Sequence, residues 1–101
     1  MIDGPWTRDR PLVLVADDEL SMRLSISAAL AKAGFGVREA KNGREALVFF
    51  QAEKPDLVLL DVVMPEMDGY ATCAAIRRLP AGKYTQILMV TGLDDTDSIE
   101  R

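Results

Sequence analysis

The sequence predicts an α/β fold in which short, buried strands alternate with helices. Continuous apolar runs are the first observation, and they cover residues 12–16, 57–60 and 87–90. Runs of this length suit strands that are buried on both faces of a parallel sheet. The second observation is that apolar residues at helical spacing occupy the segments between these runs. The alternation predicts a doubly wound parallel sheet with right-handed crossovers and helices on both faces.

The first half of the chain predicts two strands separated by one helix. Residues 12–16 form the first strand after a loose N-terminal extension, residues 1–11. A stripe at helical spacing follows and stops at Gly34, because glycine commonly ends helices. The stripe consists of Met22, Ile26, Ala29, Leu30 and Ala33. Residues 35–40 then form a second strand, with Val37 as its apolar anchor.

A second helix and a third strand follow. The Asn42-Gly43 turn signal precedes a helix over about residues 44–53, and Pro55 stops that helix. Its inward face carries Ala46, Leu47 and Phe50. The third strand then ends at Asp61.

The last predicted elements are a third helix and a fourth strand. The helix covers about residues 70–79, with Cys73 and Ile76 facing inward. Residues 80–85 form a connection and residues 86–91 form the fourth strand. Residues 94–101 are expected to be a loop entering another helix.

Composition limits the class of protein. A chain of 101 residues, 49% hydrophobic and 28% charged, predicts one soluble domain able to bury a core. The net charge of −4 argues against nucleic-acid binding, and no apolar stretch is long enough to span a membrane. Cys73 is the single cysteine and cannot form an internal disulfide, so we expect a cytoplasmic protein.

Histidine is absent from the sequence. This removes the commonest general base and the commonest metal ligand together. A Ser-His-Asp hydrolase and a histidine-rich zinc site are therefore excluded for this chain. Any chemistry must use carboxylates, hydroxyls and lysines.

Polar residues follow three of the predicted strands. Asp17 and Asp18 come directly after the first strand, and Asp61 ends the third. Thr91 ends the fourth strand. Ligands of open α/β sheets bind beyond the carboxyl ends of the strands. These side chains would therefore form an acidic cup able to handle phosphate or a metal ion.

A structural role is the alternative for the same residues. Asp17 and Asp18 could cap the first helix, since acids are favoured in a first turn, and taken alone these two roles are evenly supported. For Glu19 capping is the preferred interpretation. Taken alone, Thr91 is equally compatible with an ordinary β-branched strand end.

The combination of these residues with one loop is specific. The loop Met64-Pro65-Glu66-Met67-Asp68-Gly69 follows the third strand, and Thr91-Gly92 follows the fourth. With these motifs, the chain from Leu12 onward resembles a response regulator receiver domain of two-component signalling. The resemblance implies a flavodoxin-like sheet of strand order 2-1-3-4, with a fifth strand missing from the chain.

The resemblance also implies a role for each site residue. Asp61 would accept a phosphoryl group from the phosphohistidine of a partner. Asp18, Asp61 and the backbone carbonyl of Val63 would hold Mg²⁺ or Mn²⁺, and Asp17 would act through a metal-bound water. Thr91 would donate its hydroxyl to a phosphoryl oxygen. The residues expected to shape the surrounding loops are Met64, Pro65, Gly69 and Gly92.

A phosphoacceptor module without turnover of a free substrate is the function that this resemblance implies. Its partners would be a sensor histidine kinase or phosphotransfer protein, and an output domain beyond Arg101 or a separate effector. One alternative is an aspartate-nucleophile Mg²⁺ phosphohydrolase, although that class carries its acids two residues apart on the first strand. The other is a receiver-like scaffold that works without phosphorylation.

A complete receiver would continue beyond this chain. It would add a fourth helix, a fifth strand that ends in a lysine and carries an aromatic switch residue, and a fifth helix. We therefore expect residues 12–101 to be a receiver domain that is incomplete at its C-terminus. Strand 86–91 would then be an exposed edge that favours self-association, so a homodimer is possible.

Overall fold

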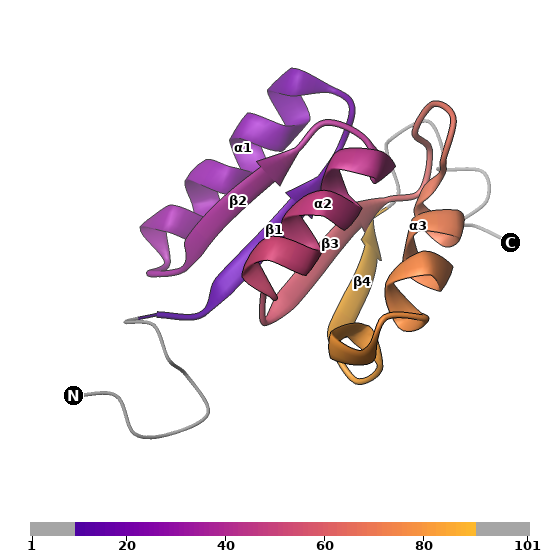
Figure 1. Ribbon diagram of the computed structural model, residues 1–101. Coiled ribbons are helices and arrows are strands. Elements are labelled where there is room, and N and C mark those ends of the chain that lie inside the picture. The colour runs from indigo at the N-terminus through magenta and orange to yellow at the C-terminus, as the bar shows by residue number, and fades with distance from the viewer. Residues whose placement is uncertain (1–9, 91–101) are drawn as a thin grey trace, which may run out of the picture.

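A computed structural model describes residues 10–90, which form a four-stranded parallel sheet flanked by helices (Figure 1). The sheet order is β2-β1-β3-β4. In chain order the elements are β1 (Leu12–Ala16), α1 (Leu20–Lys32), β2 (Gly36–Ala40), α2 (Gly43–Glu53), β3 (Leu57–Asp61), α3 (Gly69–Arg77), the short 3₁₀-helix η1 (Pro80–Gly82) and β4 (Gln86–Val90). The predicted fold class and strand order are confirmed.

The register of the sheet brings the strand ends level with one another. Ala16, the last residue of β1, pairs with Ala40 of β2 and with Leu60 of β3. Asp61, the last residue of β3, pairs with Val90 of β4. The loops that follow β1 and β3 therefore start side by side at the same edge of the sheet.

The helices form two layers, one on each face of the sheet (Figure 1). Helix α1 packs on β1 and β2, whereas α2 and α3 pack on each other and on the opposite face. Side chains alternate along a strand, so Leu14 of β1 faces α2 and α3 while Val13 and Val15 face the α1 layer. No helix within residues 10–90 is long and apolar enough to cross a membrane.

The main core lies between the sheet and the pair formed by α2 and α3. Its buried members are Leu14, Ala16, Ala40, Ala46, Phe50, Val58, Leu60, Met64 and Ile76. The inward faces predicted for the second and third helices are confirmed, since Phe50 and Ile76 are fully buried. Leu47 and Cys73 are partly buried and pack against the same cluster.

The predicted inward stripe of α1 is wrong in part. Met22, Ile26 and Leu30 are half-buried, but Ala29 and Ala33 are exposed. Ser27 is buried in their place, with an exposure of 8%. The face of α1 that packs on the sheet therefore contains both apolar residues and a serine. The alanines do not indicate which face of the helix is buried, because a small side chain is tolerated both in the core and at the surface.

Helix α2 begins with two hydrogen bonds between side chains and backbone N–H groups. The side chain of Asn42 accepts the backbone N–H of Glu45 at 2.8 Å, and Glu45 accepts the N–H of Lys41 at 3.0 Å. The first bond satisfies a donor that the first helical turn leaves open, and the second ties the residue before the N-cap to the helix. The predicted turn at Asn42-Gly43 is therefore the N-cap of a helix that starts at Gly43.

The third helix is shorter than predicted, ending at Arg77 rather than near residue 79. Pro80 explains the difference, because it restricts the preceding residue and places Leu79 in extended backbone. The segment expected to be a plain connection also contains η1. Thr91, Gly92 and the predicted helix entry at 94–101 lie outside the described residues.

Candidate functional site

The first part of the site is the loop after β1. Its backbone is tied to the sheet, since the Asp17 N–H donates to the carbonyl of Ala40 at 3.0 Å. The Asp17 carboxylate is 4% exposed and accepts the N–H of Glu19 at 2.9 Å. Such a bond between a carboxylate and a backbone N–H two residues later orders a loop. Asp18, the next residue, is exposed.

Capping by Glu19, the preferred interpretation from sequence, is confirmed for its position but not for a hydrogen bond of its side chain. Glu19 occupies the N-cap position of α1, but its side chain makes no capping hydrogen bond. Its carboxylate instead lies 3.5 Å from the hydroxyl of Ser21. The acids before α1 therefore serve the loop and the sheet edge rather than the orphan N–H groups of the helix.

The second part of the site is Asp61 at the end of β3. Its carboxylate is half-buried and accepts a long hydrogen bond, 3.3 Å, from the N–H of Val63. The backbone after it is fixed on two sides. The N–H of Val62 donates to Val90 of β4 at 3.1 Å, and the N–H of Gly69 donates back to Val62 at 2.9 Å. Asp61 thus projects from a rigid support.

The two parts meet in a cluster of three carboxylates, which we call the acidic cluster. Asp17, Asp18 and Asp61 each offer an oxygen, and these oxygens all lie within 4.8 Å of one another. The structure therefore brings together the three acids that were expected to meet at this edge. Val63, whose carbonyl was expected to bind metal, follows Asp61 by two residues and is 62% exposed.

Within residues 10–90, the carboxylates of the acidic cluster form no ion pair. The pKa of Asp61 is raised from 3.8 to about 6, mainly by burial and then by the charges of Asp17 and Asp18, against the lowering effect of the Val63 hydrogen bond. Crowded hard oxygen donors with an excess of negative charge are what Mg²⁺ prefers. The donor set therefore fits the expected metal.

The loop between β3 and α3 is held at both ends. Met64 is 6% exposed and packs in the core, while Asp68 caps α3 by accepting a backbone N–H at 2.8 Å. Between them, the N–H of Met67 donates to the carbonyl of Pro65 at 2.7 Å, and Glu66 has a φ of 69°. This is a γ-turn with a left-handed central residue, a rare and strained conformation. Strain of this kind requires a well-anchored loop.

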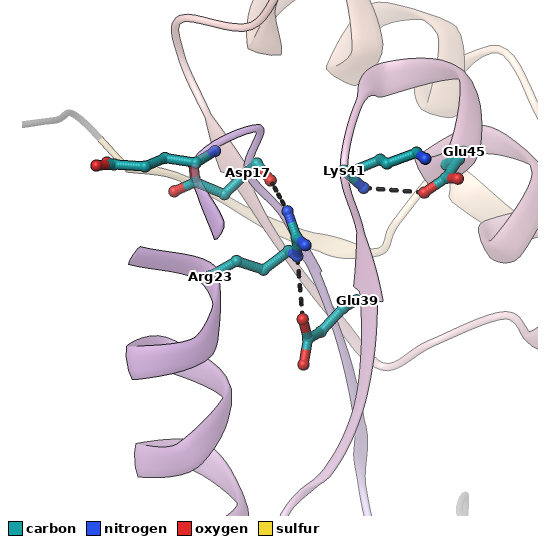
Figure 2. A network of polar contacts seen from close by, with 6 residues as sticks. Asp17, Arg23, Glu39, Lys41 and Glu45 are labelled. Atoms are coloured by element: carbon teal, nitrogen blue, oxygen red, sulfur yellow. Dashed lines mark hydrogen bonds and ion pairs between the residues drawn. The ribbon is translucent and has the colours of Figure 1, made fainter. Parts of the chain in front are cut away.

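Sequence reasoning missed one pair of residues beside the acidic cluster. Figure 2 shows that Arg23 of α1 reaches both the backbone carbonyl of Asp17, at 2.8 Å, and the carboxylate of Glu39 in β2, at 3.0 Å. The one available signal is an arginine five residues after Asp18, at a position where the helix turns toward the sheet. Nothing in the sequence indicated that its partner would be a backbone oxygen.

Comparison with known proteins decides the family. The family model described as the response regulator receiver domain matches residues 13–101. The chain belongs to this family. The match favours the receiver interpretation over the phosphohydrolase and the phosphorylation-independent scaffold that the sequence left open.

Curated relatives of this receiver domain are regulatory proteins. The chain is 43% identical over 83 residues to a probable transcriptional regulator, ycf27, of Cyanophora paradoxa, covering 82% of this chain and 34% of that protein. It is 39% identical over 82 residues to the response regulator MprA of Mycolicibacterium vanbaalenii, covering 81% and 35% respectively. The chain thus spans about a third of the length of the curated relatives that it matches.

Solved structures of receiver proteins share the fold. The Vibrio cholerae chemotaxis protein CheY4 matches with a TM-score of 0.78 and 35% identity, over 90% of this chain and 78% of that one. A putative response regulator from Chloroflexus aurantiacus matches with a TM-score of 0.82 and 33% identity, over 89% and 74%. The receiver architecture therefore rests on both sequence and structure.

Proposed function

We propose that this receiver domain accepts a phosphoryl group on Asp61 from the phosphohistidine of a partner protein. The observation that carries the proposal is the acidic cluster, in which Asp17, Asp18 and Asp61 converge from two strand ends. Phosphoryl transfer requires in-line positioning and neutralised charge more than covalent help from the protein. The rigid support of the Asp61 carboxylate provides the positioning. The two further acids provide ligands for a metal ion that neutralises charge.

Asp61 suits the nucleophile better than its neighbours do. The Asp17 carboxylate is buried and accepts the N–H of Glu19, and Asp18 is exposed on the loop. Asp61 lies on a strand end, and within residues 10–90 the single backbone hydrogen bond that it accepts is the long one from Val63. One of its oxygens would attack phosphorus while the P–N bond breaks. The electron pair of that bond would stay with the departing imidazole nitrogen.

Asp18, Asp61 and the backbone carbonyl of Val63 would hold Mg²⁺ or Mn²⁺, with Asp17 acting through water. When bound, the ion neutralises the transferred phosphoryl oxygens and keeps the nucleophile ionised. The raised pKa of Asp61 supports this arrangement, because relief of the mutual repulsion of the acids would lower it again. Thr91 would donate its hydroxyl to a phosphoryl oxygen, and Met64, Pro65, Gly69 and Gly92 would shape the loops.

The partners follow from the same chemistry. These 101 residues contain no histidine, and we propose that the phosphohistidine belongs to a sensor histidine kinase or a phosphotransfer protein. Residues 12–101 would form the receiver unit after an extension of residues 1–11, and they would switch an output domain beyond Arg101 or a separate effector. The domain would act in the cytoplasm and would turn over no free substrate.

Labelling by a small phosphodonor tests the proposal directly. Acetyl phosphate with Mg²⁺ should add one phosphoryl group, seen by intact-mass spectrometry and removed by hydroxylamine. Asp61→Asn should abolish the label. Asp68→Asn is the matched control, since asparagine caps a helix as well as aspartate does and should leave labelling unchanged. Full labelling of the Asp61→Asn variant would contradict the assignment.

A further inference from the structure

We infer that Arg23 is a positioning residue that holds the Asp17-Asp18 segment in place against Asp61. The inference rests on the proposed function, because it concerns the geometry of the same metal ligands. Arg23 touches no carboxylate of the acidic cluster. It acts on the backbone that carries two of these carboxylates, and through Glu39 it ties that backbone to β2.

The contacts of Arg23 join three elements of the fold (Figure 2). Its Nη1 donates to the Asp17 carbonyl at 2.8 Å, and its Nε donates to Oε1 of Glu39 at 3.0 Å. The side chains are 13% and 34% exposed, so this ion pair is shielded more than the pairs Arg38–Glu53 and Arg44–Glu66. Shielded, charge-assisted hydrogen bonds in a fork geometry fix orientation as well as distance.

The contacted carbonyl is the one that joins the two acids. It belongs to the peptide bond between Asp17 and Asp18, so its direction sets where the Asp18 backbone begins. The other side of Asp17 is fixed by its N–H, which donates to the carbonyl of Ala40 at 3.0 Å. Two strand-anchored bonds therefore hold the peptide on either side of Asp17. Without Arg23, only the one from Asp17 N–H to β2 would remain.

The Asp17-Asp18 segment needs this support because the carboxylates of the acidic cluster repel one another. Three carboxylates within 4.8 Å push one another apart, and the exposed loop residue Asp18 is the one free to yield. Arg23 resists that movement through a backbone bond, while Glu39 neutralises its charge. A residue that orients metal ligands without touching the metal alters affinity by about tenfold or more when it is removed.

The sign of the effect on Mg²⁺ affinity separates positioning from simple charge. If Arg23 acted merely as a nearby cation, its removal would make the acidic cluster more negative and would strengthen Mg²⁺ binding. If it positions the ligands, Arg23→Met should weaken binding by about tenfold. Methionine keeps much of the apolar stem, so packing of α1 is altered little.

Calorimetric titration of the 101-residue chain with Mg²⁺ makes this measurement, beside thermal unfolding in EDTA. Arg38→Met is the matched control. Arg38 neighbours Glu39 on β2, pairs with Glu53 at 3.3 Å and lies over the ring of Phe49 at 3.8 Å, away from the acidic cluster. We expect both variants to lower the melting temperature and only Arg23→Met to weaken Mg²⁺ binding. Unchanged or tighter binding by Arg23→Met would overturn the inference.

Variants at Glu39 test the same link if Arg23→Met does not fold. Glu39→Gln keeps an oxygen that can accept from Arg23 and should retain Mg²⁺ affinity within about twofold, whereas Glu39→Ala should weaken it severalfold. Equal affinities for these two variants would contradict the link. If the wild-type chain bound Mg²⁺ and took the phosphoryl label while all these variants matched it, only the inference would fail. If the wild-type chain bound no Mg²⁺, the proposed function would fail and the inference with it.

Discussion

The carbonyl oxygen of Asp61 occupies the space that a β-carbon on Gly69 would need. The colliding atom is backbone, and it belongs to the residue that we propose as the phosphoacceptor. The N–H of Gly69 also donates to the carbonyl of Val62 at 2.9 Å. The end of β3 and the start of α3 are therefore packed closer than any side chain allows, which holds the loop between them against the site.

Gly69→Ala should disturb both the fold and the site. Neither the strand end nor the helix start can yield easily, so we expect a loss of about 1–3 kcal/mol in the free energy of unfolding, with weaker Mg²⁺ binding. Chemical denaturation and Mg²⁺ titration measure the two effects. Gly36→Ala is the control, because its added methyl group would meet the Leu12 side chain at an ordinary 3.5 Å. Equal stability of the two variants would contradict the argument.

The ionisation of Asp61 should make the metal-free protein less stable as the pH rises. The folded-state pKa of about 6 lies above the ordinary 3.8, so the folded chain binds this proton more tightly than the unfolded chain does. The contribution of Asp61 to the free energy of unfolding therefore falls between about pH 4 and pH 6 and stays constant above that range. Solvent screening of the half-buried group reduces the change to about 1 kcal/mol.

Comparison with Asp61→Asn isolates this contribution. Urea unfolding of both proteins in EDTA, from pH 4 to pH 8, should show the asparagine variant gaining stability relative to wild type up to about pH 6. The difference should then level off. A difference that does not change with pH would mean that the pKa of Asp61 is the same in the folded and unfolded chains.

Mg²⁺ should stabilise the fold through the acidic cluster. Binding only to the native state adds about 2.7 kcal/mol at a hundredfold excess over Kd. Millimolar Mg²⁺ should therefore raise the melting temperature, and Asp18→Ala should remove most of the rise. Without metal, the same variant should equal or exceed wild type in stability, because one repelling charge is gone. An equal Mg²⁺ shift in both proteins would place the metal elsewhere.

The strands and the acidic cluster were predictable because their signals are local. A short continuous apolar run such as 57–60 predicts a strand that is buried on both faces of a parallel sheet. The acid that follows this strand must then lie at the edge where the parallel strands end. Asp17, Asp18 and Asp61 could therefore be grouped before their distances were known. The start of α3 was equally readable, since Asp68-Gly69 carries both a capping carboxylate and a residue without a side chain.

The features that were missed depend on how elements rotate against one another. The contact between Arg23 and the Asp17 carbonyl exists because α1 turns a polar residue toward the sheet, which no apolar periodicity reveals. The strained turn at Glu66 could not be predicted from sequence either, because it also depends on tertiary contacts. Its φ of 69° is imposed by the anchored ends of the loop rather than favoured by glutamate itself.

Ser27 offers a test of packing under α1. Its hydroxyl is buried and has no hydrogen-bond partner among residues 10–90, so within this part of the chain no protein group replaces its bonds to water. Ser27→Ala should raise the free energy of unfolding by about 1 kcal/mol more than Ser25→Ala does. Ser25 is exposed on the same helix, so that control accounts for the higher helix propensity of alanine. Equal gains in denaturant unfolding would show that the Ser27 hydroxyl carries no penalty.

Strand β4 is expected to promote self-association of the 101-residue chain. Within residues 10–90 it pairs with β3 alone, and Leu88 on its α1-side face is 53% exposed. An edge with open backbone groups beside an exposed apolar side chain is a template for a second copy. Leu88→Lys should shift sedimentation velocity toward the monomer. Gln86→Lys, which adds the same charge at an already exposed position of β4, should shift it less. A wild-type chain that stays monomeric at high concentration would contradict this expectation.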